Sequence, residues 1–197
     1  MPDYQSSITY FRKPGKENTS KVLELSRLKA KELGISTAIV ASTTGYTAKL
    51  AVEMLEGMDL VIVTHSTGFR EPDEQEFDNE VKTFVESRGA KLLTAQHSFL
   101  GVNRAIRDSL GGSQSDDVIA NVLRLFGQGM KVVCEIALMA ADAGLVSCSE
   151  PVLSIAGTGR GADLGIVVYP ANSRRFFDLK IVDVFCMPSM KHPLVKE

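Results

Sequence analysis

The sequence predicts a three-layer α/β sandwich whose sheet is mostly parallel and has an antiparallel C-terminal edge. In the first half, strand-length apolar runs alternate with helical patterns, which favours parallel strands joined by right-handed helical crossovers. Near the end, only Gly157–Asp163 separates the predicted strands Val152–Ala156 and Leu164–Tyr169. That connection is too short for a parallel crossover, so these two strands should pair antiparallel. A chain of 197 residues suits a single domain spanning residues 1–197.

Hydrophobic spacing and turn residues define the elements of the first half. Leu60–Val63 is apolar on both faces, as expected for a strand buried between two helical layers. Phe77, Val81 and Phe84 recur at helical spacing and indicate a helix that buries one face. The expected elements are, in order, strand Ile8–Phe11, a helix from Asn18 or Thr19 to Gly34, strand Thr37–Ala41, helix Gly45–Leu55, strand Asp59–Thr64, helix Pro72–Arg88 and strand Lys91–Thr94.

The second half begins with helical patterns and ends with strands. Acidic residues gather at two predicted helix starts, where the helix dipole favours negative charge, and we interpret them as capping charges rather than catalytic pairs. They are Glu71, Asp73, Glu74 and Glu76 at one start and Asp116 and Asp117 at another. The expected elements are helices Val102–Leu110, Asp116–Phe126 and Lys131–Ala143, and strands Val152–Ala156, Leu164–Tyr169 and Lys180–Phe185.

A tight turn after strand Thr37–Ala41 is the strongest functional signal in the sequence. The apolar run stops at small hydroxylic residues around a glycine, and a helical pattern follows. The start of that helix has unpaired backbone N–H groups and partial positive charge, and the hydroxyl groups add donors. The turn therefore predicts a phosphate or another anion, with helix capping alone as the simpler alternative. The predicted ligand-binding residues are Ser42, Thr43, Thr44, Gly45, Tyr46 and Thr47.

A glycine-rich loop links the two strands that should pair antiparallel. Its alternating glycines let the backbone approach a ligand closely, and its arginine can bind phosphate oxygens or stack on a planar ring. It is not a dinucleotide-binding fingerprint, because a strand follows it, and it lacks the Gly-Lys-Ser/Thr of a Walker loop. The alternative is a flexible hairpin with an exposed arginine. The predicted ligand-binding residues are Gly157, Thr158, Gly159, Arg160 and Gly161.

Two histidines follow predicted strands at the edge of the sheet where parallel α/β proteins bind ligands. Each can donate to a phosphate or transfer a proton near neutral pH, and each can instead be an ordinary polar loop residue. The planar part of a ligand is expected near His65–Phe69 and Gln96–His97. The predicted ligand-binding residues are His65, Ser66, Thr67, Gly68, Phe69 and His97.

Composition argues against several classes of function. A net charge of −2, without a basic cluster interleaved with aromatic residues, argues against nucleic-acid binding. The apolar runs are shorter than a membrane span, and the N-terminal residues have no signal pattern, so no membrane partner is expected. Three separated cysteines without a CxxC motif fit reduced thiols in a cytoplasmic protein, and no metal site is expected.

These loops together resemble the C-terminal α/β domain of pyruvate kinase. Val40–Ala48 is similar to a strand, turn and helix of that domain, where a Thr-x-Ser-Gly-x-Ser/Thr-Ala turn holds the phosphate of an allosteric sugar phosphate. Gly157–Asp163 resembles the glycine-rich effector loop near the end of that domain. Pro14–Thr19 and Leu125–Gly129 resemble segments of standalone proteins similar to this domain, mainly archaeal and bacterial. The residues that match the family's loops are Ser42, Thr44, Gly45 and Thr47 in the turn, and Gly157, Arg160 and Gly161 in the loop.

The resemblance covers nearly the whole chain and implies the fold of the pyruvate kinase C-terminal domain. For the standalone proteins it implies flavin mononucleotide (FMN) as a cofactor, without a settled reaction. Pyruvate kinase carries out its chemistry in a barrel domain, and 197 residues filled by one α/β domain leave no room for a barrel. We therefore expect no pyruvate kinase activity from this chain.

The leading functional hypothesis is a protein that binds a phosphorylated small molecule, with FMN as the preferred ligand. The alternatives are a flavin-dependent or other enzyme that acts on a phosphorylated metabolite with His65 or His97 as an acid or base, and a regulatory or structural module. A homo-oligomer built on a dimer is also expected, because Phe176-Phe177 and Val184–Met187 place apolar groups near the end of the chain. The same groups can instead belong to an edge strand packed in the core.

Overall fold

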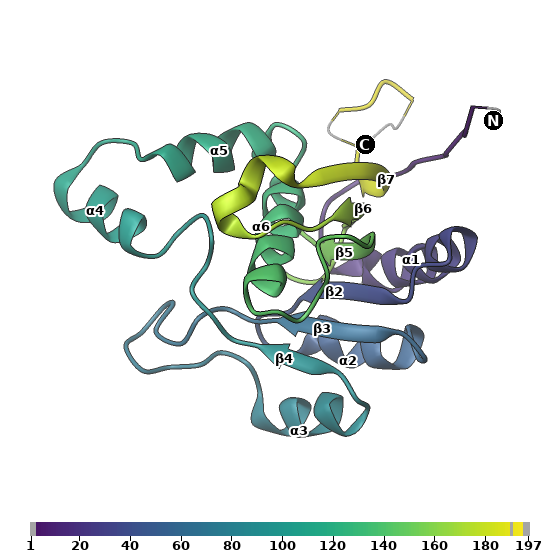
Figure 1. The fold of residues 1–197 in the computed structure, drawn as a ribbon, viewed down its shortest axis with the longest axis horizontal. Helices are drawn as coiled ribbons and strands as arrows, with labels where there is room; N and C mark the ends of the chain where they lie inside the picture. Colours follow the sequence, from purple (N-terminus) through teal and green to yellow (C-terminus); the bar gives the residue numbers. More distant parts are fainter. Residues whose placement is uncertain (1–2, 190, 195–197) are drawn as a thin grey trace.

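The computed structural model describes residues 3–189 and 191–194. Within these ranges the strands form one sheet in the order β1-β7-β6-β5-β2-β3-β4 (Figure 1). β2 pairs in parallel with both β3 and β5, and β4 pairs in parallel with β3. β6 runs antiparallel to β5 and β7, and β1 pairs in parallel with β7. The strands are β1 (Thr9–Phe11), β2 (Thr37–Ala41), β3 (Asp59–Val63), β4 (Lys91–Leu93), β5 (Val152–Ala156), β6 (Leu164–Tyr169) and β7 (Lys180–Pro188).

Both predicted strand pairings are confirmed. β2 and β3 are parallel, and the short loop between β5 and β6 joins antiparallel strands. The sheet nevertheless extends further than the C-terminal pair, because β1 adds to the free side of β7. The reversed strand β6 therefore lies inside the sheet, between β5 and β7, and the N-terminal strand forms that edge.

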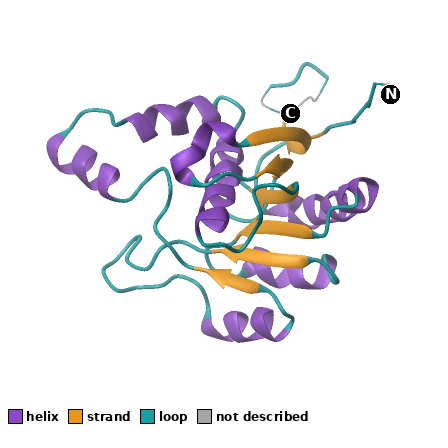
Figure 2. Cartoon of the chain, in the orientation of Figure 1, coloured by secondary structure: helices purple, strands orange, loops and turns teal. Residues whose placement is uncertain are grey.

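Helices cover both faces of the sheet, as the three-layer prediction requires (Figure 2). On β2, Val40 packs in the core beneath α1, α2 and α3, whereas its neighbour Ile39 packs beneath α6, because successive strand side chains point to opposite faces. α5 packs on the α6 side, and α4 extends away from the sheet (Figure 1). Within the described ranges, no helix has the length and apolar composition needed to cross a membrane. The helices are α1 (Thr19–Leu33), α2 (Tyr46–Met54), α3 (Asn79–Ser87), α4 (Val102–Leu110), α5 (Ser115–Arg124) and α6 (Gln128–Asp142).

One helix is much shorter than its hydrophobic spacing indicated. The sequence predicts a helix over Pro72–Arg88, but α3 comprises only Asn79–Ser87. Asp78 caps α3 by accepting hydrogen bonds from two backbone N–H groups, each at 2.9 Å, and such a cap marks a helix start. Phe77 still packs in the core, but from the preceding loop. Residues 64–78 thus form a long loop at the carboxyl end of β3.

Most of the apolar groups behind the oligomer prediction belong to the core. Phe185 and Cys186 on β7 are buried. Phe176 packs edge-on against Phe99, with ring centres 5.6 Å apart. Phe177, in contrast, is 84% exposed. Core packing therefore explains the apolar part of β7, and the homo-oligomer stays a prediction that depends mainly on Phe177.

Candidate functional site

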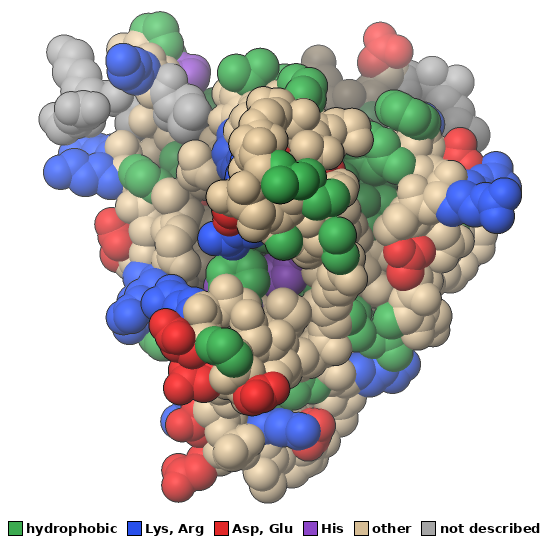
Figure 3. All heavy atoms as spheres, turned by 90° about the vertical axis from the view of Figure 1, so that its left-hand side faces the viewer, with side chains coloured by type: hydrophobic (Ala, Val, Ile, Leu, Met, Phe, Trp, Pro, Cys, Tyr) green, Lys and Arg blue, Asp and Glu red, His purple; other side chains and the backbone are tan. Residues whose placement is uncertain are grey.

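A cavity of about 750 Å³ opens at the carboxyl ends of β2, β3 and β5, the edge where open α/β sheets bind ligands. Figure 3 views the molecule from the left-hand side of Figure 1, and a histidine lies in a recess near the centre of that face. Loops expected to bind ligand bring many of their predicted residues to this cavity. The predicted residues that line it are Ser42, Thr43, Thr44, Tyr46, Thr47, His65, Phe69, His97, Gly157, Gly159, Arg160 and Gly161. The predicted residues outside its lining are Gly45, Ser66, Thr67, Gly68 and Thr158.

The Ser42–Thr47 turn presents backbone donors at the start of α2. Among the described residues, the N–H groups of residues 43–47 have no backbone acceptor. The hydroxyl oxygen of Ser42 accepts a hydrogen bond from the backbone N–H of Ala48 at 3.2 Å. Capping of the helix therefore accounts for Ser42, while Thr44 and Thr47 line the cavity with further hydroxyl groups.

Gly45 shapes this turn without lining the cavity. Its φ is +100°, in the left-handed region that favours glycine. A Cβ at this position would lie 2.7 Å from Cγ1 of Val81 on α3. The close packing of the turn against α3 thus requires a glycine, and it fixes the position of the N–H groups that follow.

The buried carboxylate of Asp163 ties the glycine-rich loop to the N-terminal segment. Its Oδ2 accepts hydrogen bonds from the backbone N–H groups of Gly15 at 2.9 Å and Thr158 at 3.0 Å. Burial raises the pKa of Asp163 in spite of these hydrogen bonds. Thr158 therefore holds the loop in place through its backbone rather than facing the cavity.

The N-terminal segment Pro14–Thr19 provides part of the cavity wall, which the sequence analysis did not include in the site. A Cβ at Gly161 would lie 2.5 Å from Oγ1 of Thr19 and 2.6 Å from Cα of Lys16, so the loop and the segment are in close contact. This contact places Lys16 in the cavity, with its ammonium 3.9 Å from the centre of the Tyr46 ring. A cation on an aromatic face is a favourable arrangement.

His65 connects a hydroxyl group of the turn to a carboxylate. Its Nδ1 donates to Oε2 of Glu76 at 2.6 Å, which leaves Nε2 3.3 Å from Oγ1 of Thr43. Burial lowers the pKa of His65 against the opposing effect of Glu76, so the ring is neutral near pH 7. Glu76 also pairs with Arg70 at 2.9 Å. The interpretation of these acidic residues as charges at a helix start is wrong, because α3 begins at Asn79 and Glu71, Asp73, Glu74 and Glu76 all lie in the loop before it. The loop turns the Glu76 carboxylate toward His65.

His97 has both ring nitrogens engaged within the protein. Its Nε2 accepts a hydrogen bond from the backbone N–H of Ser66 at 3.3 Å, and its Nδ1 donates to Oε2 of Glu135 at 3.3 Å. These bonds hold the loop after β3 against α6. His97 thus lines the cavity as a residue that positions its neighbours, and its nitrogens are less available to a ligand than Nε2 of His65.

A buried ion pair on α6 lies next to His97. Glu135 is 2% exposed, pairs with Lys131 one turn earlier, and accepts a hydrogen bond from the backbone N–H of Phe99 at 3.0 Å. Burial opposes the ionisation of Glu135, but His97 and Lys131 outweigh it and lower its pKa. Burial also lowers the pKa of Lys131. This pair was not predicted from the sequence, where its one local signal is the i, i+4 spacing of opposite charges.

Three of the rings that line the cavity, those of His65, Phe69 and His97, pack against one another. The Phe69 ring centre lies 4.0 Å from that of His65 and 5.1 Å from that of His97. The guanidinium of Arg104 lies over Phe69, 5.3 Å from its ring centre. This cluster provides a planar, partly apolar surface between the turn and α4.

Basic side chains dominate the charge of the cavity. Seven lysine or arginine residues line it, against two carboxylates, Glu76 and Glu135. In a chain of net charge −2, this concentration gives the cavity a locally positive potential. The described ranges contain no group of three or more His, Cys, Asp or Glu residues placed to hold a metal ion. The basic residues are Lys16, Arg70, Arg104, Arg107, Arg124, Lys131 and Arg160.

A family model described as "Pyruvate kinase, alpha/beta domain" matches residues 20–167 of the chain. The chain belongs to this family. The resemblance predicted from the two loops is thus confirmed, together with the fold that it implied.

The chain is also similar to three solved structures of pyruvate kinase from Cryptosporidium parvum, each at 16% sequence identity. The TM-scores are 0.41 over 78% of this chain, 0.39 over 83% for a complex with ADP, and 0.36 over 86%. The match covers 23% of each of those chains, so this chain spans about a quarter of their length.

The pyruvate kinase α/β match contains both predicted loops. It also contains every basic residue that lines the cavity except Lys16, which precedes the matched range. The cavity is therefore built mainly from the part of the chain that matches the pyruvate kinase family, and the N-terminal segment adds to one wall.

Proposed function

We propose that this chain binds a phosphorylated small molecule, with the phosphate at the Ser42–Thr47 turn and FMN as the ligand. The observation that carries the proposal is the set of N–H groups of residues 43–47, which have no backbone acceptor in the described part of the chain and lie beside a cavity rich in basic side chains. Backbone donors at a helix start favour a phosphate, and nearby cations neutralise its charge. Lys16 and Arg160 are the cations contributed by the segments that pack around the turn.

The remaining lining suits the planar part of FMN. Phe69 and His65 pack against each other with ring centres 4.0 Å apart, and the cations of Arg104 and Lys16 lie over the rings of Phe69 and Tyr46, so a flat ligand would extend or replace these contacts. Such surfaces favour a flat aromatic ligand. When bound, FMN supplies reversible redox chemistry at its ring system. In this proposal the protein binds the phosphate, packs against the ring system and limits the access of water.

Calorimetric titration of ligand-free protein with FMN and with riboflavin tests the proposal. FMN should bind more tightly, because riboflavin lacks the phosphate. Thr44→Ala combined with Thr47→Ala should weaken FMN binding by about two to four powers of ten, because each charge-assisted hydrogen bond contributes about 1.5–3 kcal/mol. Arg160→Ala should weaken FMN binding further by removing a cation.

A matched control is Thr83→Ala combined with Ser87→Ala, which removes two hydroxyl groups that bond to the backbone of α3. This control should leave FMN affinity unchanged. Equal affinities for FMN and riboflavin would contradict a phosphate site at the turn. No binding of either compound would favour the regulatory or structural module instead.

A second candidate function is proton transfer on the bound ligand. The arrangement of Thr43, His65 and Glu76 favours it, because a neutral imidazole oriented by a carboxylate can accept a proton at Nε2. The test is oxidation of NADH by the FMN-loaded protein between pH 5 and pH 8, with dissolved dioxygen as the final electron acceptor. Turnover should fall as His65 becomes protonated at acid pH, and His65→Gln should remove that pH dependence. Oxidation no faster than with free FMN would contradict this candidate.

A further inference from the structure

Two walls of the cavity come from opposite sides of the sheet. The turn wall comprises Ser42–Thr47 and Gly157–Gly161, and the helical wall comprises the lining residues of α4, α5 and α6. α2 packs on one face of the sheet, whereas α5 and α6 pack on the other (Figure 1). A ligand held at the turn wall by its phosphate therefore leaves the helical wall available to other groups.

Two arginines of the helical wall are only weakly compensated. Arg124 donates to the neutral amide oxygen of Asn121 at 2.9 Å and also interacts electrostatically with Asp117, a carboxylate that already pairs with Arg107. Arg104 lies 3.6 Å from the exposed carboxylate of Asp108, a long and solvent-screened contact. Arg107 differs from both, since it pairs closely with two carboxylates and is already neutralised.

Lys131 completes this basic cluster from α6. Its side chain is 5% exposed, and its partner Glu135 also interacts with His97. Arg124 and Arg104 add electrostatic repulsion to the effect of burial, and together they lower the pKa of Lys131. These three cations share one wall with a single buried carboxylate, that of Glu135. An added anion would reduce the repulsion between them.

We propose that Arg104, Arg124 and Lys131 form a second anion site, which binds the carboxylate or phosphate group of a small molecule beside the phosphorylated ligand. This inference rests on the proposed function and adds the chemical class of a co-substrate. Guanidinium groups suit such anions because they can donate two parallel hydrogen bonds. The volume of about 750 Å³ lies in the upper part of the range of small-molecule pockets, about 300–1,000 Å³.

Arg104 also connects the second anion site to the planar ligand surface. Its guanidinium lies over Phe69 at 5.3 Å from the ring centre. An anion bound by Arg104 would therefore lie close to a ring system packed against Phe69. A co-substrate held there is suitably placed to react with the first ligand.

The experiment is a titration of ligand-free protein with inorganic phosphate, in which ¹H–¹⁵N NMR spectra are recorded at each phosphate concentration. Two groups of signals should shift: the backbone amides of residues 43–47, and the Nε–Hε groups of Arg104 and Arg124. Arg104→Gln combined with Arg124→Gln lacks these two reporter groups, so binding at the second site is followed in it, and in the unchanged protein for reference, by the backbone amide of Lys131. The response of that amide should weaken by at least about tenfold, and the response of residues 43–47 should remain unchanged. Thr44→Ala combined with Thr47→Ala should weaken the response of residues 43–47 and leave the response of Arg104 and Arg124 unchanged.

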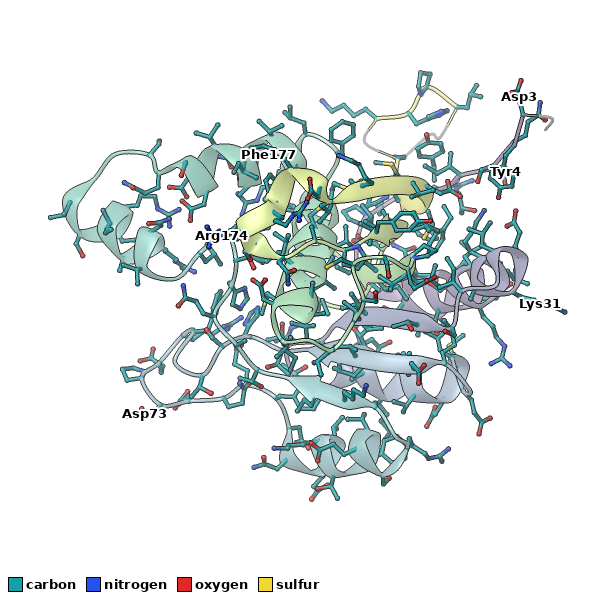
Figure 4. All side chains as sticks on the ribbon, viewed as in Figure 1. Asp3, Tyr4, Lys31, Asp73, Arg174 and Phe177 are labelled. Carbon is teal, nitrogen blue, oxygen red and sulfur yellow. The ribbon has the colours of Figure 1, made fainter. Side chains whose placement is uncertain are left out.

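A charge-matched control is Lys31→Gln combined with Lys82→Gln. Lys31 lies on α1, on the side of the molecule away from α4 and α5 (Figure 4), and Lys82 is exposed on α3. This pair removes the same charge from the chain as the two arginine substitutions. It should leave both phosphate responses unchanged, and a loss equal to that of the arginine variant would overturn the second site.

The outcomes separate this inference from the proposed function. Shifts confined to residues 43–47 would overturn the second site and support the turn. Shifts confined to Arg104 and Arg124 would support the second site and contradict a phosphate at the turn. An absence of shifts would overturn both.

In a final pair of titrations, phosphate and succinate are added separately to protein that is already saturated with FMN. A separate co-substrate requires that Arg104 and Arg124 still respond to one of these anions. Loss of both responses would show that a single ligand occupies both walls and would overturn a separate co-substrate.

Discussion

The turn wall and the helical wall present positive charge to the same cavity by different means. In the turn wall, backbone N–H groups are held in place by close packing, such as that of Gly45 against Val81. In the helical wall, flexible arginine side chains extend from α4, which buries none of its residues, and from α5. The difference indicates that the turn wall suits a group of constant shape, such as phosphate, whereas the helical wall can adapt to variable anions.

The largest effect is expected at the buried charge pair of the helical wall. Lys131→Met should lower the free energy of unfolding by about 3–5 kcal/mol, because it leaves the Glu135 carboxylate buried without its main partner. Adding Glu135→Leu should recover only part of this loss, because the backbone N–H of Phe99 and Nδ1 of His97 then lose their acceptor. Arg104→Gln should change stability by no more than about 0.5 kcal/mol, because its side chain is exposed. Urea unfolding measures all three, and an undiminished stability of Lys131→Met would contradict the burial of this pair.

The next largest effect on the free energy of unfolding is expected at Gly45 of the turn wall, and Gly112, between α4 and α5, serves as the comparison. Gly45→Ala should cost about 2–4 kcal/mol, because the strain of a positive φ adds to an overlap with Val81. Gly112 has a φ of +86°, but a Cβ there would have nothing within 4 Å. Gly112→Ala should therefore cost only about 1 kcal/mol. Equal losses in urea unfolding would show that the packing of the turn adds nothing to the backbone strain.

The smallest effect on stability is expected at Phe177, which lies outside the cavity in the short helical segment Ser173–Asp178 (Figure 4). Phe177→Ser should change the free energy of unfolding of one chain by no more than about 0.5 kcal/mol, because the side chain is exposed. In light scattering, the unchanged protein should have the mass of a dimer or a larger assembly, and the variant should have a lower mass at the same concentration. A monomer mass for the unchanged protein would contradict the oligomer, and an unchanged mass for the variant would place the interface elsewhere.

The turn wall follows from the sequence more directly than the helical wall does. Ser42, Thr44 and Thr47 come from one short segment, so their convergence follows from a strand, a turn and a helix. Glu76 was misinterpreted, because the spacing of Phe77, Val81 and Phe84 suggested that the helix began earlier than it does. Hydrophobic spacing locates the buried face of a segment, but it does not show whether an apolar residue is buried from a helix or from a loop.

The sequence by itself determined the order of the strands and helices along the chain, the antiparallel pairing of β5 with β6, and the hydroxyl-rich turn. These features depend on local periodicity and on the length of a connection. Only the tertiary structure decided that Lys16, Arg104, Arg124 and Lys131 line one cavity and that Glu76 reaches His65. The physical reason is that these residues come from segments far apart in the chain, and packing on the two faces of the sheet, rather than spacing along the sequence, brings their charges together.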